Sequence, residues 1–370
     1  MSGDSIPLAV NRDSGFIPDP FDAKDHYYQA EDSTRPQLSV NLRKTHAPNV
    51  SGVYNQGQTG SCTANAVAAA FWYEEKAGRR AKAWGSAGPS RLFIYWNARG
   101  GYKNDSHDIK HVSDEGSQGR AAIKGLAKVG ACSEADCPFV DFDGIKSKLK
   151  KTKLKGNALD EAVEEEIKKA VNTKPSDNAF RNATPHKITS YYRLDPQRPD
   201  KDVKSLTKEQ KDQIGSSLLE NLRKCLTEGF PVTFGFWFYL PDDDDDDAFD
   251  TTKKPFVLRD VWHRGVDSFP RHTFPHDLPP ERRITDTDGK LRKPGHSVLA
   301  IGYDDERQQV LVQNSWGAHW SGNGTFWMPY AWITDFAATN DFWTIRTTED
   351  PPDQKPKLWQ EVHQEILAGA

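Results

Sequence analysis

The residue pattern changes near residue 185, and this change constrains the fold more strongly than any other feature of the sequence. Before it, small and apolar residues form stretches that favour helices. After it, runs rich in β-branched and aromatic residues favour strands. These runs cover residues 186–194, 230–240, 296–304, 308–316, 324–330 and 341–347. We therefore expect an α+β fold with a mainly helical front and a β-structured back.

The helical part is expected over residues 51–184 and the β part over residues 185–347. The spacing predicts helices from Ser61 to Gly78, from Pro89 to Gly100 and near residues 118–131, and a further helix lies near residues 216–229. In the third of these helices, one apolar face is approximated by Ala121, Ile123, Leu126 and Val129.

Four segments lie outside these regular patterns. Residues 1–50 are rich in Pro, Asp and polar side chains, so we expect an extended segment laid over the body, and residues 348–370 form a C-terminal tail. Residues 146–170 run from lysines to acidic residues, which predicts a solvated surface insertion with a short helix. Residues 242–293 predict a long loop insertion, in which six aspartates favour a solvated loop over a Ca²⁺ site because the required Gly and distal Glu are missing.

The composition of the chain limits the classes of molecule that we expect it to bind. The 370 residues carry a net charge of −4, so we expect neither nucleic acid nor a membrane surface as a partner. The start of the sequence shows no signal-peptide pattern, and four cysteines are too few for a disulfide framework. We expect a cytoplasmic location, with export by a non-classical route left open, and the oligomeric state stays undetermined.

Cys62 opens a predicted helix directly after the glycines of the segment NQGQTGS. A helix N-terminus favours the thiolate, which is the nucleophilic form of cysteine. The alternative is a structural one, in which Cys62 is a small buried apolar residue at a helix start. A nucleophilic cysteine needs a histidine base and usually an Asn or Asp that orients it.

His296 is the histidine best placed for that role. Seven others lie in polar or Pro-rich loops, whereas His296 opens the apolar strand HSVLAIGY. The next predicted strand ends at Asn314. Two neighbouring strands are therefore expected to present His296 and Asn314 together.

The three motifs QGQTGSC62, GH296SVLAIGY and N314SWG, in this order, resemble those of the papain-like cysteine peptidases. The resemblance runs over residues 40–345 and is closest to the shorter, prodomain-free microbial members. It implies a papain-like two-lobed fold, with a helical lobe, an antiparallel β-barrel-like lobe and the active site in the cleft between them.

The resemblance also implies roles for individual residues. Cys62 corresponds to the nucleophile of a thiol protease, His296 to the general base and acid, and Asn314 to the residue that orients the imidazole. Gln56 corresponds to the side-chain donor of the oxyanion hole, and Trp316 to the indole that covers the Asn–His pair. The implied activity is hydrolysis of a peptide or protein substrate through a thioester acyl-enzyme on Cys62.

The resemblance also implies two substrate contacts, and the sequence differs from the family pattern at two positions. Gly116 matches a glycine that pairs with the substrate backbone, and Gly295 borders the pocket for the side chain two positions before the scissile bond. Thr59 and Thr63 stand where many secreted relatives have a cysteine and a tryptophan. Cys132 and Cys137 lack zinc-site spacing, so we expect no metal and no organic cofactor.

Two alternatives stay open at this point. The same site can pass the acyl group to an amine, which would make the chain a transpeptidase or an amide-forming enzyme. The fold can also serve as a non-catalytic binding module, with residues 242–293 as its working surface or as a lid.

Overall fold

The structure is a computed structural model of the chain. The structure describes residues 15–45 except 32, 53–101 except 76 and 78–87, 114–196, 206–237, 284–285, 291–292, 295–347 except 321–322 and 336–337, and 356–364 except 359 and 363. Within these ranges, none of the helices combines the length and hydropathy that crossing a bilayer requires. The description below covers these residues.

Helix α2, Cys62–Glu74, runs through the centre of the molecule, and every residue of it is buried. Its alanines let neighbouring elements approach closely on all sides, as expected for a helix that is apolar all round. In the helical lobe it packs against α3 (Arg91–Trp96) and α4 (Gly119–Val129), and the lobe also contains the π-helical turn η3 (Asn97–Gly101) and α7 (Asp177–Ala183). The predicted stop at Gly78 lies outside the described residues.

Helix α4 follows its prediction with a difference of one residue on its buried face. Ile123 and Leu126 are buried as expected, but Ala122 is buried in place of Ala121, which is only partly covered. Residues 122, 123 and 126 lie on one side of a 3.6-residue turn, whereas residue 121 lies at its edge. The prediction for Ala121 is therefore wrong, while the helix itself is confirmed.

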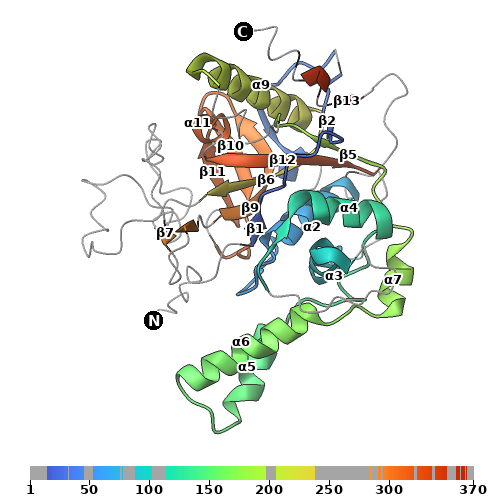
Figure 1. The fold of residues 1–370 in the computed structure, drawn as a ribbon, viewed down its shortest axis with the longest axis vertical. Coiled ribbons are helices and arrows are strands. Elements are labelled where there is room, and N and C mark those ends of the chain that lie inside the picture. Colours follow the sequence, from blue (N-terminus) through green and yellow to red (C-terminus); the bar gives the residue numbers. More distant parts are fainter. Residues whose placement is uncertain are drawn as a thin grey trace, which may run out of the picture.

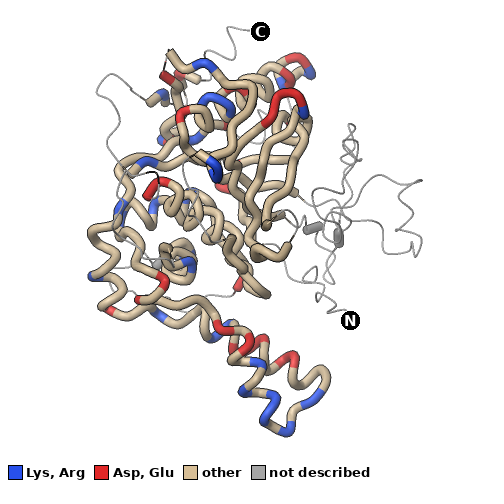
Figure 2. The backbone as a smooth tube through the Cα atoms, turned by 180° about the vertical axis from the view of Figure 1, so that it is seen from behind, with Lys and Arg blue, Asp and Glu red and all other residues tan. Residues whose placement is uncertain are grey.

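The insertion at residues 146–170 contains two helices and not one short helix. Helix α5, Phe142–Lys150, and helix α6, Asn157–Asn172, form a hairpin that projects from the helical lobe (Figure 1). Basic residues cluster at its tip, and acidic residues lie along α6 (Figure 2). Ile167 and Val171 are buried at the base of α6, so packing there stabilises a second helix that the charge pattern alone did not predict.

The β lobe contains a sheet in which the strand order is β11-β10-β9-β6-β12-β5-β2-β13, and β3 pairs with β9 off this path. Its pairings are antiparallel except for the parallel contact of β2 with β5. The long helix α9 (Lys208–Thr227) lies beside the sheet (Figure 1). The strands are β2 (His26–Tyr27), β3 (Ser39–Asn41), β5 (Ser190–Arg193), β6 (Val232–Trp237), β9 (Gly295–Asp304), β10 (Gln309–Gln313), β11 (Thr325–Pro329), β12 (Thr339–Arg346) and β13 (Lys357–Leu358).

Two short helices and a two-stranded pair accompany the main sheet. The short helices α1 (Leu42–Thr45) and α11 (Tyr330–Ile333) flank β3 and β11. Within residues 242–293, the structure describes only the strands β7 (Ile284–Thr285) and β8 (Leu291–Arg292), which pair with each other in antiparallel fashion. The rest of that predicted loop insertion lies outside the described residues.

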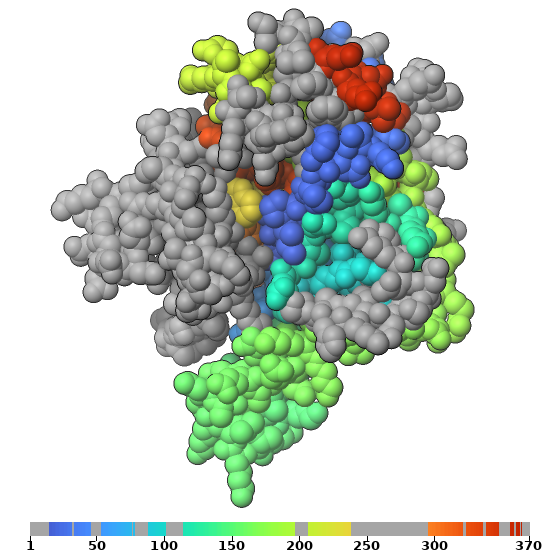
Figure 3. Space-filling view, viewed as in Figure 1, coloured from blue at the N-terminus to red at the C-terminus, as the bar shows by residue number. Residues whose placement is uncertain are grey.

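The N-terminal segment pairs with strands of both lobes. Strand β3 pairs with β9, β2 pairs with β5, and β1 (Phe16–Ile17) pairs in parallel with β4 (Ser117–Gln118) next to α4. In the space-filling view the blue segment runs across the face between the yellow end of β6 and the teal residues near β4 (Figure 3). The segment is extended, as predicted, but backbone pairing fixes it in place.

A buried cluster of charged side chains holds the part of this segment that directly follows β1. The carboxylate of Asp25 accepts hydrogen bonds of 2.9 and 2.5 Å from Arg120 of α4. Asp19 accepts a 2.8 Å bond from the indole N–H of Trp343 and bonds from the backbone N–H of Arg120. Arg193 lies 3.7 Å from Asp19 and contacts two further carboxylates, those of Asp195 and Asp341. Buried charges are tolerated when they are paired in this way.

Candidate active site

Cys62 is the first residue of α2, as the sequence predicted, and its side chain has no exposed surface. The Ser61 side chain makes no capping bond to the helix, because its hydroxyl contacts Thr59 and Asn65 instead. The first N–H groups of α2 therefore point to the space at the start of the helix. Burial raises the pKa of the Cys62 thiol to about 11, although a hydrogen bond from the backbone of Ser297 works in the opposite direction.

His296 and Asn314 are joined by a 2.8 Å hydrogen bond between Nε2 and Oδ1. His296 is the second residue of β9, and Asn314 directly follows β10, which pairs with β9. The predicted meeting of the two side chains on neighbouring strands is therefore observed. Because α2 packs against β9, the sulfur of Cys62 bonds the backbone of Ser297, the residue after His296.

The bonding of Asn314 defines which nitrogen of His296 carries the proton. Oδ1 of Asn314 also accepts a 2.7 Å bond from the backbone N–H of Ser315, so the oxygen is assigned to this side of the amide. An accepting oxygen requires a donor at Nε2 of His296. The neutral imidazole then has an unprotonated Nδ1, which is able to accept a proton. Burial lowers the pKa of His296 to about 4, against the bond to Asn314, which raises it.

Aromatic rings surround the imidazole. The indole of Trp316 stacks on His296 with ring centroids 4.8 Å apart and an interplanar angle of 21°. Trp320 packs edge-on against Trp316 at 5.1 Å, and Phe236 packs edge-on against His296 at 5.8 Å. Trp316 therefore covers His296 as the resemblance implied. Trp320, which the sequence pattern did not predict as a site residue, packs on the far side of Trp316 and extends this aromatic cover.

Gln56 connects the loop before α2 with the strand ends of the β lobe. Its Oε1 accepts a 2.6 Å bond from the hydroxyl of Ser315, and its Nε2 donates a 2.9 Å bond to the carbonyl of Thr59. Its backbone N–H also donates to the carbonyl of Ser315 at 2.8 Å. These bonds hold the Gln56 amide beside the start of α2. Ser315 is a further site residue, which lies within the N314SWG motif but received no role of its own from the resemblance.

Gly116 and Gly295, the two predicted substrate contacts, both lie against the N-terminal segment. Gly116 has a φ of 96°, and an added Cβ would overlap the backbone of Gly15. An added Cβ on Gly295 would lie 2.8 Å from both Phe16 and Trp237. Both positions therefore require glycine for close approach of another group.

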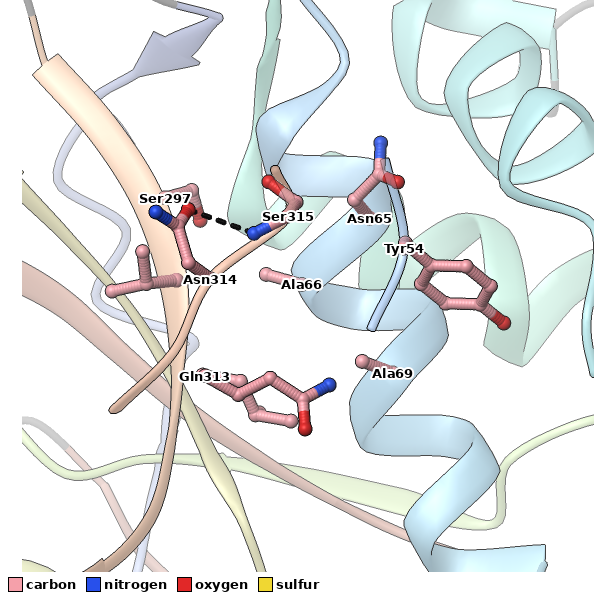
Figure 4. Close-up of a pocket in the computed structure, with 10 residues that line it drawn as sticks. Tyr54, Asn65, Ala66, Ala69, Ser297, Gln313, Asn314 and Ser315 are labelled. Carbon is pink, nitrogen blue, oxygen red and sulfur yellow. Dashed lines mark hydrogen bonds between the residues drawn. The ribbon is translucent and has the colours of Figure 1, made fainter. Parts of the chain in front are cut away.

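A small cavity of about 10 Å³ lies beside Asn314, between α2 and strands β9 and β10 (Figure 4). Ala66 and Ala69 line it from α2, and Asn314 and Gln313 line it from the other side. The dashed line in Figure 4 marks the bond from Ser315 to Asn314. The alanines predicted to form helix core therefore also leave space next to Asn314.

The three other cysteines are free, buried and distant in sequence from this site. A side-chain hydrogen bond links Cys132 to Cys137, whereas Cys225 bonds the carbonyl of Phe230 at 3.6 Å. In the part of the chain that the structure describes, no three His, Cys, Asp or Glu side chains are placed to hold a metal ion.

Comparisons with known proteins agree with this geometry. A profile of the papain family cysteine proteases matches residues 283–335, which include His296 and Asn314. A relative from Acanthamoeba polyphaga mimivirus, described as an uncharacterized peptidase C1-like protein, is 29% identical over 298 residues, which are 80% of this chain and 70% of the relative.

Solved structures extend the comparison over most of the chain. Xylellain, a cysteine protease from Xylella fastidiosa, is 29% identical, and the match has a TM-score of 0.58 and covers 91% of this chain and 97% of xylellain. Procathepsin B S9 from Trypanosoma congolense shares the fold at 10% identity, with a TM-score of 0.51 and coverage of 90% and 87%. The family profile, the relatives and the fold therefore all show that the chain is similar to the papain family cysteine proteases, and the site geometry agrees with this similarity.

Proposed function

We propose that Cys62, His296 and Asn314 carry out peptide-bond hydrolysis, with Gln56 and the backbone N–H of Cys62 as oxyanion donors. The observation that carries this proposal is the His296–Asn314 bond, because it leaves Nδ1 as the proton acceptor on the strand that also contacts the Cys62 sulfur. Trp316 shields that bond from water by stacking on the imidazole.

In the acylation half, Nδ1 of His296 takes the thiol proton while sulfur attacks the substrate carbonyl carbon. The negative charge that develops on the carbonyl oxygen is stabilised by the N–H groups of Cys62 and Gln56. His296 then gives its proton to the leaving amine as the C–N bond breaks, which leaves a thioester on Cys62.

In the deacylation half, His296 takes a proton from water, and the resulting hydroxide attacks the thioester carbonyl. The C–S bond breaks, the acid product leaves, and the proton returns from His296 to the sulfur. Asn314 keeps the imidazole in one tautomer and one orientation through both halves.

The substrate is a peptide or protein. We further propose that nucleic acid and membrane surfaces are not partners, which the net charge of −4 supports. The cytoplasmic location expected from the sequence stays a prediction.

The test is labelling of the full chain with a peptidyl epoxide, followed by mass spectrometry of all four cysteines. We expect modification of Cys62, loss of peptide hydrolysis in proportion to it, and no reaction at Cys225, which is equally buried. The variant Cys62→Ser should lose both labelling and hydrolysis, whereas Cys225→Ser should keep both. Equal labelling of the four cysteines, or hydrolysis that survives in Cys62→Ser, would contradict the proposal.

A further inference from the structure

The tip of the α5–α6 hairpin carries positive charge that no described carboxylate neutralises. Residues 142–155 contain six lysines and one aspartate, so this stretch has a charge of +5 in a chain whose net charge is −4. All six lysines are exposed, and in the part of the chain that the structure describes none of them forms an ion pair. We call these six side chains the basic tip: Lys146, Lys148, Lys150, Lys151, Lys153 and Lys155.

The acidic side chains of the same hairpin pair with other lysines. Glu164 and Glu165 each lie 3.3 Å from the ammonium group of Lys168, and Glu166 lies 3.8 Å from that of Lys169. These pairs are formed within α6 itself, between residues three and four positions apart. They leave the charge of the basic tip available to another molecule.

A structural role explains only part of the basic tip. Basic side chains in the last turn of a helix stabilise it through the helix dipole, and Lys148 and Lys150 have this place in α5. Lys146 and Lys150 are four positions apart, where like charges repel, and Lys153 and Lys155 lie beyond the end of α5. These charges are therefore better explained by binding of an acidic partner than by stabilisation of the hairpin.

The base of the hairpin lies beside the proposed oxyanion donor. Phe142 begins α5, and an added Cβ on Gly57 would lie 2.3 Å from its ring. Gly57 directly follows Gln56 in the loop before α2. At the other end of this loop, an added Cβ on Gly60 would lie 3.0 Å from the backbone nitrogen of Gly116. The hairpin therefore begins at the end of the loop that is distant from Gly116.

This end of the loop faces the part of a substrate that follows the scissile bond. Gly295 borders the expected pocket for the side chain two positions before that bond. Gly116 is close to this pocket, because the adjacent residues Gly15 and Phe16 contact Gly116 and Gly295, respectively. The Gly60 end of the loop thus lies on the side of the residues before the scissile bond, and the hairpin lies on the side of the leaving amine.

The basic tip is too far from the base of the hairpin for a short peptide to reach it. Asn157, at the start of α6, is ten residues from the buried Ile167, which corresponds to about 15 Å along a helix (Figure 1). An extended chain covers about 3.3 Å per residue, so on the order of five or more residues must separate the scissile bond from a group at the tip. Binding there therefore selects longer polypeptides.

The residue types of the basic tip favour carboxylates over phosphates and lipids. Residues 143–155 contain no arginine and no aromatic residue, so they lack the bidentate donor for phosphate and the ring that stacks on a base. Leu154, which is 38% exposed, is a single side chain, whereas binding to a bilayer surface needs an apolar helix face. Flexible lysines are point charges that pair with a run of glutamates or aspartates without a fixed geometry.

We propose that the basic tip is a docking surface for acidic segments of protein substrates, at a position several residues after the scissile bond. The inference rests on the proposed function, because it names the substrate class of that same site. Docking away from the reacting atoms stabilises the bound substrate and the transition state equally. It therefore lowers KM and leaves kcat unchanged.

The test compares two internally quenched peptides that share one cleavable sequence and differ in their tails. After the scissile bond, each has a spacer of about ten Gly and Ser residues, with a mean span on the order of 18 Å. The spacer is followed by about six glutamates in one peptide and by as many glutamines in the other. Steady-state kinetics with both peptides are measured on the parent chain and on two variants.

The two variants change the net charge by the same amount at different places. The tip variant combines Lys148→Gln, Lys150→Gln, Lys151→Gln and Lys153→Gln. The control variant replaces four exposed lysines outside the hairpin and combines Lys44→Gln, Lys128→Gln, Lys208→Gln and Lys211→Gln.

We expect kcat/KM in the parent chain to be about tenfold higher for the glutamate tail, because several weak exposed pairs combine to a factor of this size. The difference should lie in KM. The control variant should keep this preference, whereas the tip variant should reduce it to under about threefold. Addition of about 0.5 M NaCl should reduce the preference of the parent chain in the same way, because salt screens exposed charges.

Binding without cleavage is measured by fluorescence anisotropy of the glutamate tail on Cys62→Ser, with and without the tip substitutions. Equal kcat/KM for the two tails in the parent chain, or a preference that persists in the tip variant, would overturn the docking surface and leave the catalytic roles standing. Binding that the tip substitutions abolish, in a chain whose parent cleaves neither peptide, would support the docking surface and overturn the catalytic roles. Tighter binding of a single-stranded oligonucleotide or of anionic vesicles than of the glutamate tail would overturn the assignment to acidic protein segments.

Discussion

The hydroxyl of Ser315 donates a 2.6 Å hydrogen bond to Oε1 of Gln56 across the junction of the two lobes. Gln56 lies before the helix that carries Cys62, and Ser315 follows Asn314. This single bond therefore relates the proposed oxyanion donor on one lobe to the proposed histidine–asparagine pair on the other. Its removal should move Gln56 without touching the nucleophile or the base.

Ser315→Ala should lower kcat/KM by about tenfold, because the buried Gln56 oxygen loses its partner and the amide is then held only by its bond to the carbonyl of Thr59. The loss should appear in kcat, since the oxyanion forms only during reaction. Steady-state kinetics on a peptide substrate measure it. Ser216→Ala is the control, because Ser216 is exposed, bonds only a carbonyl within α9, and should leave kcat unchanged. A loss confined to KM would contradict the positioning of Gln56.

Gln56→Ala should lower kcat more than Ser315→Ala does, because it removes the oxyanion donor itself and not only the residue that positions it. Loss of one oxyanion donor typically raises the barrier by about 3 kcal/mol, or roughly a hundredfold in kcat. Epoxide labelling of Cys62 should be much less affected, since it forms no carbonyl oxyanion. Comparable losses in both reactions would show that Gln56 has another role.

Asn314→Ala should reduce kcat/KM on the order of a hundredfold, because His296 is no longer held in the tautomer with an unprotonated Nδ1. The NMR shifts of the imidazole nitrogens of His296 report that tautomer directly. Asn157→Ala, an exposed change at the start of α6, is the control and should retain both activity and spectrum. An unchanged tautomer in Asn314→Ala would contradict the role given to Asn314.

The stability of the fold should depend on His296 in mildly acidic solution. Burial lowers the pKa of His296 from 6.5 to about 4, so between these values the unfolded chain binds a proton that the folded chain does not. The free energy of unfolding should therefore fall as the pH falls through this range, by up to about 3 kcal/mol from this group. Urea unfolding of the parent chain and of His296→Gln at several pH values measures it. The variant should show a shallower slope, whereas His26→Gln, an exposed change, should keep the slope of the parent chain.

Arg193 should be far more important for stability than any exposed basic residue. It is 1% exposed, and burial works against its charge, but the carboxylates of Asp195, Asp341 and Asp19 raise its pKa above the usual range. Arg193→Ala should cost on the order of 3 to 5 kcal/mol of unfolding free energy, because it leaves buried carboxylates without their partner. Lys208→Ala removes an exposed pair with Asp212 and should cost under about 0.5 kcal/mol. Similar losses in the two variants would contradict this reading of the cluster.

The sequence predicted the helices and strands that carry Cys62, His296 and Asn314, because local patterns determine them. An alanine-rich helix and an apolar strand remain recognisable without knowledge of their neighbours. The pairing of β9 with β10 then brings His296 to Asn314, and the short turn between the strands makes this partnership a local one.

The N-terminal segment and the charge cluster could not be predicted in this way. Strand β1 has two residues, too few for any periodicity, and its partner β4 lies a hundred residues away. Nothing in the local sequence marks Asp19 and Arg193 as buried, because charged side chains are usually exposed and burial of these two depends on their pairing in the folded chain. The second helix of the α5–α6 hairpin was missed for a similar reason, since the contacts at its base are tertiary.

The bonds of Asp19 and Asp25 make the two lobes depend on one stretch of chain. These carboxylates bond Arg120 of the helical lobe and Trp343 of the β lobe, and β2 and β3, which follow Asp25 and the turn after it, pair with β5 and β9 of the sheet. Separation of the lobes would therefore break buried ion pairs as well as backbone bonds, so this segment is a covalent tie that favours unfolding of both lobes as one unit.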